Sequence, residues 1–526
     1  MSASMNRRAF LRLGAVGAGA LALAACGGTS APASALGSSA GASPAGGSAA
    51  ASAKPATGGT LSVGVNDDPG FLAINAVGTQ TYNATQHIFG SLMRYDENAK
   101  LVPDLAESWT TSPDGLTWSF KLRKGVKFHN GEDFTSEAIK YSIAKFQDPK
   151  STRRVYLTSV TDVQTPDPLT ANIVTKTPTP ALPIYLCEIV DIYPPKYMAQ
   201  VGDDEFNKKP IGTGPYKLVD WQKDQQLTMD ANADYYAGKP KFDRLILRPI
   251  PQESTRVAEL LAGNVQAINY PPVQQIPQIE GSGSNTVPSS KGTLIYHVIL
   301  RSDQKPFDDK RVRQALNYAV DMDTIIKQLY GGRGTKLSGP IPAHAFGFDP
   351  TLQPYPFDIA KAKQLLSDAG YGSGVSFKMD VASEDKQLAD AVIGFWKQAG
   401  INAEIVIMEP APMVQAQIGK KIDQACLFKW GGPTFDADTV LTPRIWSKTP
   451  YSYYSTPELD NLIVGAGSTL DEAKRKDLYK QAGQIYHDDA GWVFLLVPYY
   501  NFGVSNKINW TPRADGQMVM INAAPK

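Results

Sequence analysis

The second half of the chain predicts an α/β fold with a largely parallel sheet. Between residues 375 and 428, short segments that alternate apolar and polar side chains are separated by longer segments with helical periodicity. About 470 residues follow the N-terminal segments, and that number exceeds what one hydrophobic core organises, so two or three domains are expected.

The N-terminus has the order of an export signal. The paired Arg7-Arg8 precedes a weakly apolar run from Leu13 to Ala25, and Leu-Ala-Ala leads into Cys26. This order resembles a bacterial lipoprotein signal, and the arginine pair resembles a twin-arginine signal. We expect residues 1–25 to be a signal peptide and Cys26 to carry the lipid. The alternative is a membrane-spanning helix, but the run is shorter than the roughly 20 apolar residues that a span requires.

The segment after the cysteine predicts a tether. Residues 26–58 consist almost entirely of Gly, Ala, Ser, Pro and Thr and have no periodicity that would build a core. A coil of this composition and length has an r.m.s. span of roughly 30 Å. We therefore expect residues 26–58 to be a flexible linker between the lipid anchor and the folded part.

The folded part begins with local signals for strands. Residues 59–66 alternate as a strand, which Pro69-Gly70 ends. Asp114-Gly115 precedes the alternating segment 116–122, so a hairpin is expected there. A helix is predicted to begin near Ser136.

The second half has clearer helix boundaries. Asp309 is a candidate N-cap for a helix whose apolar positions have helical spacing up to Gly331, and Asp358 is a candidate N-cap for another helix, which Gly370 ends. The α/β unit follows: strands at 375–381, 401–407 and 423–428, and helices at 386–399 and 411–419.

The composition excludes several functions. The 52 Lys+Arg and 51 Asp+Glu nearly balance, so no nucleic-acid partner is expected. The five His have no metal-ligand spacing, and we expect neither a metal nor a cofactor. Cys187 and Cys426 are either a disulfide pair or two small buried hydrophobic residues. The chain contains no His-Glu-x-x-His motif and no phosphate-binding loop, so a binding protein is favoured over an enzyme.

A series of motifs resembles one family along almost the whole chain, although each motif alone is weakly specific. In order, they resemble the extracellular solute-binding proteins, family 5, of peptide/nickel-type ABC importers. The motifs are Asp104-Leu-Ala-Glu-Ser-Trp109, Trp118 to Gly131, Ile211-Gly-Thr-Gly-Pro-Tyr-Lys217, Arg256 to Asn264, Phe307 to Leu316 and Tyr454 to Asp460.

The resemblance implies a two-lobed periplasmic-binding-protein-like fold of type II, with an extra inserted subdomain. Two chain crossings near 296–299 and 495–499 would form the hinge on which the lobes close. A monomer is expected. The implied boundaries are 59–96, 210–297 and 497–526 for lobe I, 97–209 for the inserted subdomain of lobe I, and 298–496 for lobe II.

Ligand contacts are expected just after the predicted strand 423–428, because ligands of α/β sheets bind beyond the carboxyl ends of strands. In relatives, a Trp-x-Gly segment followed by acidic residues lines the cleft. Peptide binders have an aspartate where this chain has Pro433. The alternative is that the tryptophan anchors a core and the aspartates form turns. The candidates here are Trp430, Gly431, Gly432, Asp436 and Asp438.

Further ligand contacts are expected on the loop after the first strand, at the junction of the inserted subdomain and in lobe II. Amphipathic aromatic side chains suit ligands with apolar faces and polar edges. Turn chemistry or aromatic core packing explains the same residues equally well. They are Asn66, Phe71, Tyr193, Phe346, Trp446 and Tyr451.

These observations predict a lipid-anchored, extracytoplasmic solute-binding protein in the periplasm or on the outer face of the cytoplasmic membrane. It would capture a ligand between its lobes and deliver it to an ABC transporter permease. The family implies a dipeptide or oligopeptide. An oligosaccharide, another polar organic solute, and a sensor lipoprotein without a transport role remain alternatives.

Overall fold

The computed structural model describes residues 58–73, 79–431 and 434–526. The predicted signal peptide 1–25, the predicted lipidation site Cys26 and the predicted linker up to residue 57 lie outside the described residues, as do Gly432 and Pro433. The names lobe I, inserted subdomain and lobe II are used below for the ranges predicted above, and their boundaries remain our proposal.

The strand predicted at the start of the folded part is confirmed as β1 (Thr60–Val65), which lies inside the lobe I sheet. It pairs in parallel with β10 on one side and with β11 on the other. Leu61 and Val63 are fully buried, because alternate side chains of a strand face the same side. The other elements of lobe I are α1 (Thr79–Ile88), β2 (Met93–Tyr95), β8 (Tyr216–Gln222), β9 (Gln226–Ala231), β10 (Arg244–Pro249), α5 (Glu253–Leu261), β11 (Ala267–Asn269), η2 (Val273–Gln275), α6 (Ile276–Gly281), β12 (Asn285–Thr286), β13 (Ser289–Lys291), β20 (Ile508–Asn509) and β21 (Ala524–Pro525).

The inserted subdomain is built on a separate four-stranded sheet in the order β4-β5-β7-β6. The predicted hairpin at Asp114-Gly115 is confirmed, because β4 and β5 flank it and pair antiparallel. The helix predicted from Ser136 is α2, which packs against β6 and β7. The elements are β3 (Leu101–Pro103), β4 (Ala106–Thr111), β5 (Thr117–Leu122), α2 (Ser136–Gln147), η1 (Arg154–Leu157), β6 (Val160–Asp167), β7 (Thr170–Thr175), α3 (Leu182–Glu188) and α4 (Pro195–Lys208).

The lobe II sheet has the order β17-β16-β18-β14-β19. Its first three strands are the predicted α/β unit, and β16 pairs in parallel with both β17 and β18, as expected. The strands β14 and β19 extend this sheet in antiparallel pairing. The elements are β14 (Leu294–Leu300), α7 (Lys310–Tyr318), α8 (Met322–Leu329), β15 (Gly334–Lys336), α9 (Ile359–Asp368), β16 (Val375–Ala382), η3 (Ser383–Asp385), α10 (Lys386–Trp396), η4 (Lys397–Ala399), β17 (Ile401–Met408), α11 (Pro410–Ile418), β18 (Ala425–Gly431), α12 (Asp438–Arg444), α13 (Pro457–Ser468), α14 (Glu472–Asp488) and β19 (Trp492–Ser505).

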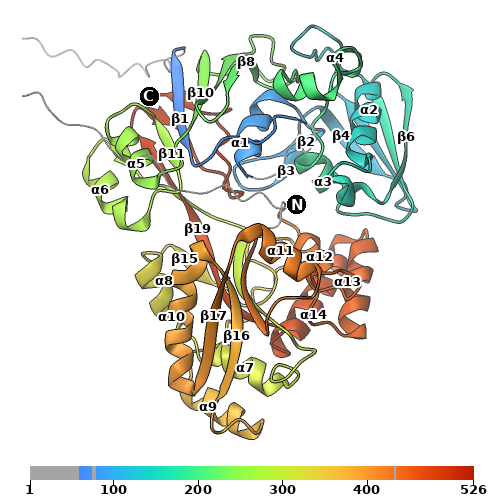
Figure 1. Cartoon of the computed structure of the whole chain (residues 1–526). Helices are drawn as coiled ribbons and strands as arrows, with labels where there is room; N and C mark the ends of the chain where they lie inside the picture. The colour runs from blue at the N-terminus through green and yellow to red at the C-terminus, as the bar shows by residue number, and fades with distance from the viewer. Residues whose placement is uncertain (1–57, 74–78, 432–433) are drawn as a thin grey trace, which may run out of the picture. The chain divides into compact units, whose positions relative to one another are not determined.

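Strand alternation divides the core of lobe II between the two faces of this sheet. Along β18, Ala425 and Leu427 enter the cluster formed with α7 to α10, whereas Cys426, Phe428 and Trp430 face the cluster formed with α11 to α14. In Figure 1, α8 and α10 accordingly lie on the opposite side of the strands from α13 and α14. Trp430 lies two residues after Phe428 on the strand, so its side chain faces the same layer as α12.

Aspartate side chains begin several helices as predicted. Asp309 accepts a hydrogen bond from the Arg311 N–H, and Asp358 accepts one from the Lys361 N–H. The prediction of one continuous helix up to Gly331 is wrong, because the chain forms two helices, α7 and α8. Asp321 starts the second by accepting from the Thr324 N–H, and this capping residue was overlooked within the helical pattern.

The strand β19 belongs to both lobes. Its first half, up to Pro498, pairs with β14 and β15, and its second half pairs with β11, β12 and β13. Figure 1 shows this long strand running from one lobe into the other. The second predicted crossing, near 296–299, falls within β14, which is hydrogen-bonded to β19.

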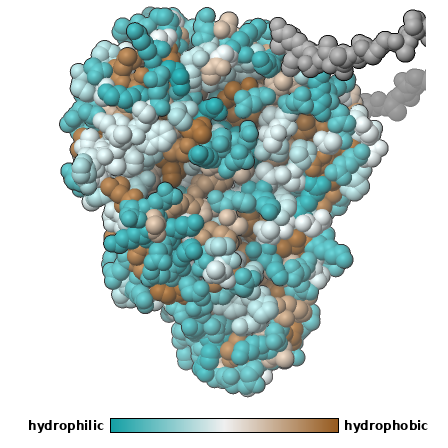
Figure 2. Space-filling view, turned by 180° about the vertical axis from the view of Figure 1, so that it is seen from behind, coloured by the Kyte–Doolittle hydropathy of each residue, from teal (hydrophilic) through white to brown (hydrophobic). Residues whose placement is uncertain are grey.

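The two cysteines are free and buried, so they do not form the disulfide that was one of the two alternatives. Cys187 lies in lobe I and Cys426 on β18. Across the described ranges, no helix has the length and apolar character needed to cross a membrane. On the face seen in Figure 2, hydrophobic residues form small groups among hydrophilic ones.

Candidate functional site

The two lobes contact each other through a polar pair and an aromatic pair. The Tyr185 hydroxyl, on α3 of the inserted subdomain, donates a hydrogen bond to the Asp438 carboxylate at the start of α12. Burial, and then the Asp438 charge, raises the pKa of Tyr185 well above its ordinary value, so the phenol stays protonated and remains a donor. Nearby, the rings of Tyr95 and Phe435 meet edge to face with centroids 5.0 Å apart. Both contacts join residues of different lobes, which describes a closed arrangement.

Two residues predicted to lie near the ligand pack against one arginine on the lobe II side, and a third belongs to the same helix as this arginine. Trp430 lies one residue before the end of β18 and donates its indole N–H to the Thr439 carbonyl at 2.9 Å, which fixes the indole against α12. The Arg444 guanidinium carbon lies 3.9 Å from the Trp430 ring centroid and 4.4 Å from that of Tyr451. Asp438 belongs to the same helix as Arg444. The predicted Trp430, Asp438 and Tyr451 therefore share one region at the contact between the lobes, which we call the interlobe site.

The structure corrects the prediction for Asp436. This carboxylate is only 1% exposed, and Arg475 on α14 engages both of its oxygens, at 2.7 and 2.8 Å. Its Oδ1 also accepts from the Asp438 N–H at 2.9 Å. Burial raises the pKa of Asp436, and the Arg475 charge opposes that shift. A carboxylate with both oxygens engaged is a fixed support for Asp438 rather than a contact for a ligand.

Tyr193 is a second correction. Its side chain is fully buried inside lobe I and packs against Phe89, Phe146 and Phe206, with ring centroids 5.2 to 5.4 Å away. The aromatic core, which was the alternative interpretation of this residue, explains it. Its place at the junction of the inserted subdomain suggested a ligand contact, but apolar packing decides where the ring lies.

The remaining predicted residues of the described ranges differ in how they relate to the interlobe site. Phe346 contacts Arg475, whose guanidinium carbon is 4.8 Å from its ring, and its strand bridge to Asp436 holds the segment after β18. Gly431 ends β18, and Trp446 follows α12 and packs on the core of lobe II. Asn66 accepts a hydrogen bond from the Asn269 amide at 2.6 Å, whereas Phe71 is 54% exposed on the loop after β1. The structure does not bring Asn66 or Phe71 into contact with Trp430.

No sequence pattern pointed to the residues that the inserted subdomain contributes. Tyr185 and Tyr156 have ring centroids 5.5 Å apart, and Arg444 and Tyr451 are among the groups that affect the pKa of Tyr156. These tyrosines come from a short helix and from a single helical turn that have no recognisable motif. They become candidates only through their contact with a segment more than 250 residues away in sequence. A single amino-acid sequence does not show which distant residues meet.

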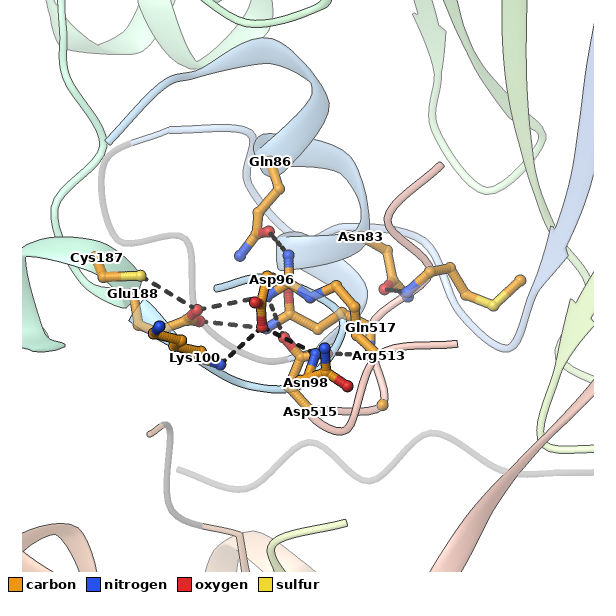
Figure 3. Close-up of polar contacts among 12 residues, drawn as sticks. Asn83, Gln86, Asp96, Asn98, Lys100, Cys187, Glu188, Arg513, Asp515 and Gln517 are labelled. Atoms are coloured by element: carbon orange, nitrogen blue, oxygen red, sulfur yellow. Dashed lines mark hydrogen bonds and ion pairs between the residues drawn. The ribbon is translucent and has the colours of Figure 1, made fainter. Parts of the chain in front are cut away.

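A separate cavity of about 340 Å³ lies within lobe I, between α1, α3 and the C-terminal segment. Glu188 and Arg513 line this cavity and form an ion pair of 3.6 Å. Figure 3 shows them in one network with Asp515 and Gln517. Burial raises the pKa of Glu188 to about 7. The network ties α3 to the C-terminal segment, while the Arg513 Nε and the Gln517 side-chain oxygen are buried without a hydrogen-bond partner.

Comparisons with known proteins agree with a two-lobed binding-protein fold. Residues 100–452 match the family model of bacterial extracellular solute-binding proteins, family 5 Middle. The chain is 31% identical to the glutathione-binding protein GsiB of Pectobacterium atrosepticum, over 77% of this chain and 82% of that protein. It is also 31% identical to heme-binding protein A of Haemophilus influenzae, over 78% of this chain and 82% of that protein. The structure of DppA from Helicobacter pylori in complex with peptide STSA superposes with a TM-score of 0.76 at 26% identity, over 89% of this chain and 98% of that one.

The fold and the contacts between lobes define a two-lobed solute-binding protein. The chain belongs to the bacterial extracellular solute-binding proteins of family 5. Proteins of this class bind a solute outside the cytoplasm and work with an ABC importer, and the relatives named above are binding proteins rather than enzymes. Among the described residues, no group of three or more His, Cys, Asp or Glu is arranged to hold a metal ion.

Proposed function

We propose that this protein captures a peptide-like organic solute between its two lobes, at the interlobe site, and delivers it to an ABC importer. The observation that supports this most directly is the hydrogen bond from Tyr185 to Asp438, because it exists only when the lobes are together. A ligand that binds the closed form better than the open form shifts the protein towards closure. The aromatic residues around Arg444 provide apolar faces with polar edges, which suit peptide side chains and amides.

A second candidate ligand class is an oligosaccharide or another polar organic solute. Peptide-binding relatives have an aspartate where this chain has Pro433, and proline offers no charge for a free amino group. Native mass spectrometry of the purified protein, followed by a thermal-shift screen of dipeptides, oligopeptides and oligosaccharides, distinguishes the two classes. A binder gains RT ln(1 + [L]/Kd) of stability. Shifts with sugars and none with any peptide would contradict the peptide proposal.

Closure should depend on Tyr185. We expect Tyr185→Phe to weaken binding of the best compound from that screen about tenfold, because a hydrogen bond to a carboxylate contributes roughly 1.5–3 kcal/mol. The ring and its packing are retained, so the melting temperature without ligand should stay close to that of the wild type. Titration calorimetry measures the change. Tyr371→Phe, which removes a hydroxyl far from the boundary, is the matched control and should bind normally, whereas equal affinities for Tyr185→Phe and wild type would show that the contact plays no part.

We also propose that the protein is held at the membrane by lipid on Cys26. The support is the Leu-Ala-Ala-Cys sequence and the composition of the linker that follows it. We expect Cys26→Ser to release the protein from the membrane fraction, because one or more acyl chains supply the anchoring energy. Fractionation with immunoblotting measures this, and Cys426→Ser controls for the loss of a thiol. A Cys26→Ser protein that stays fully membrane-bound would rule out the anchor.

A further inference from the structure

Buried arginines in this protein usually have a carboxylate partner or several carbonyl acceptors. Within the described ranges, five arginines are less than 9% exposed: Arg153, Arg256, Arg313, Arg444 and Arg475. A guanidinium has five N–H donors in a plane and accepts nothing, so each buried one needs oxygen atoms around its edge. A buried charge is tolerated when it is paired or fully hydrogen-bonded.

Four of the five meet this requirement. Arg475 has the Asp436 carboxylate, and Arg153 has the Asp191 carboxylate at 3.1 Å together with the Ile189 carbonyl. Arg256 donates to four backbone carbonyls, and Arg313 donates to three. The chain therefore compensates buried guanidinium groups either with a carboxylate or with several carbonyl oxygens.

Arg444 differs from the other four. It is 3% exposed, and among the described residues its one hydrogen-bond acceptor is the side-chain oxygen of Gln417 at 2.9 Å. Its Nε is buried without a partner, as is the Nε of Arg475, so the difference lies in the missing carboxylate and the single acceptor. No carboxylate of the described residues lies within ion-pair distance of it. Burial lowers the pKa of Arg444 to about 10, so the group still carries its charge at neutral pH. The charge is thus buried beside a neutral amide oxygen and without a carboxylate among the described residues.

The rings around Arg444 hold it in place without supplying acceptors for its N–H groups. Trp430, Tyr451 and Phe428 have ring centroids 3.9, 4.4 and 4.6 Å from its guanidinium carbon. Cation–π contacts are favourable, and more so where water is excluded. They fix the guanidinium, but they supply no oxygen to its N–H groups. A planar guanidinium binds a carboxylate through two parallel hydrogen bonds.

Arg444 lies at the contact between the two lobes. Tyr156 of the inserted subdomain is close enough for Arg444 to affect its pKa, and Tyr156 packs on Tyr185, which bonds to Asp438. These tyrosines belong to one lobe and Arg444 to the other. Separation of the lobes removes the tyrosines from Arg444, and closure buries whatever has bound there.

We propose that Arg444 is the anion-recognising residue of the interlobe site and that it receives a carboxylate of the transported solute. This inference rests on the proposed function and adds to it that the solute is an organic acid with an apolar portion beside Trp430 and Tyr451. The solute's negative charge compensates the guanidinium only in the closed, liganded protein, which makes closure dependent on that charge.

Matched pairs of acids and neutral amides test the proposal without knowledge of the natural solute. Benzoate and benzamide are titrated against the full chain in a thermal-shift assay at constant ionic strength, as are Ala-Phe and Ala-Phe amide. We expect each acid to raise Tm in a concentration-dependent way and each amide to bind about tenfold more weakly or not at all, because hydrogen bonds to charged groups are roughly twice as strong. Equal responses to acid and amide in both pairs overturn the proposal.

Two variants locate the effect. Arg444→Met retains the apolar packing against the rings and removes the charge, so the response to benzoate should disappear while Tm without ligand stays equal or rises. A purely structural arginine would instead give a lower Tm. Arg444→Lys retains a charge without the planar fork and should bind benzoate more weakly than wild type. Arg123→Gln, which removes an arginine over Tyr236 in lobe I, should respond like wild type.

Other outcomes separate this inference from the proposed function. A benzoate response that persists in Arg444→Met places the anion elsewhere and overturns the inference. If native mass spectrometry finds a neutral solute bound to the wild type, solute capture stands and the role of Arg444 fails. If Arg444→Met does not fold, the comparison of acid with amide on the wild-type protein and on Arg444→Lys still decides.

Discussion

Replacing Asp436 with alanine is expected to lower the free energy of unfolding by about 3–5 kcal/mol, because the change leaves the buried Arg475 guanidinium without its carboxylate. Arg475 has 6% and Asp436 1% of its side chain exposed, and two hydrogen bonds of 2.7 and 2.8 Å join them. Water cannot take the place of the lost oxygens without opening the core between α14 and the segment after β18. Chemical denaturation monitored by circular dichroism measures the loss.

Two controls show that the effect comes from a buried charge. Asp133→Asn breaks an exposed ion pair with Lys127 and should leave the denaturation midpoint unchanged. The double variant Asp436→Leu/Arg475→Met removes both charges and should recover most of the lost stability, since apolar replacement of a whole buried pair is often neutral. If Asp436→Ala is as stable as wild type, the pair is not the structural support we infer. A ligand role for Asp436 would instead give normal stability and lost binding.

Local rules explain how much of the fold was predictable. The α/β unit from β16 to β18, the hairpin at Asp114-Gly115 and the caps at Asp309 and Asp358 all depend on residues within a few positions of one another. Alternation, turn residues and capping side chains act at this range. The break between α7 and α8 was missed because Asp321 lies at a position that also fits a helix, and only its bond to the Thr324 N–H distinguishes the two.

The site was predictable only on the side where it follows a strand. Trp430 and Asp438 could be placed because β18 ends beside them, which is where α/β sheets bind ligands. Whether an aspartate is free or engaged depends on a distant partner, as Arg475 shows for Asp436. The same holds for Arg444. Its neighbour on α11, Gln417, supplies an amide oxygen and no carboxylate. Which group neutralises a buried charge is decided by packing between distant segments, and the spacing of residues in the sequence does not reveal it.

The motif Ile211-Gly-Thr-Gly-Pro-Tyr also has a physical cause that the structure reveals. A Cβ built on Gly212 would lie 2.0 Å from the Ile88 carbonyl oxygen, and one on Gly214 would lie 2.6 Å from the His87 carbonyl oxygen. The Gly214 N–H donates to the Ile88 carbonyl at 2.9 Å, so this segment caps the last turn of α1. Glycine is required here because two backbones approach each other, which is one of the uses of this residue.

We therefore expect Gly212→Ala to destabilise lobe I by more than about 3 kcal/mol, because overpacking against backbone cannot be relieved by turning a side chain. The thermal unfolding midpoint and the yield of folded protein measure this. Gly394→Ala is the matched control: this glycine lies inside α10, a Cβ there meets nothing within 4 Å, and alanine should stabilise the helix by about 0.5–1 kcal/mol. If Gly212→Ala and Gly394→Ala have equal midpoints, close backbone approach is not the reason for the motif. If only Gly212→Ala lowers the unfolding midpoint or the yield, the glycine is needed for the contact between α1 and the segment before β8.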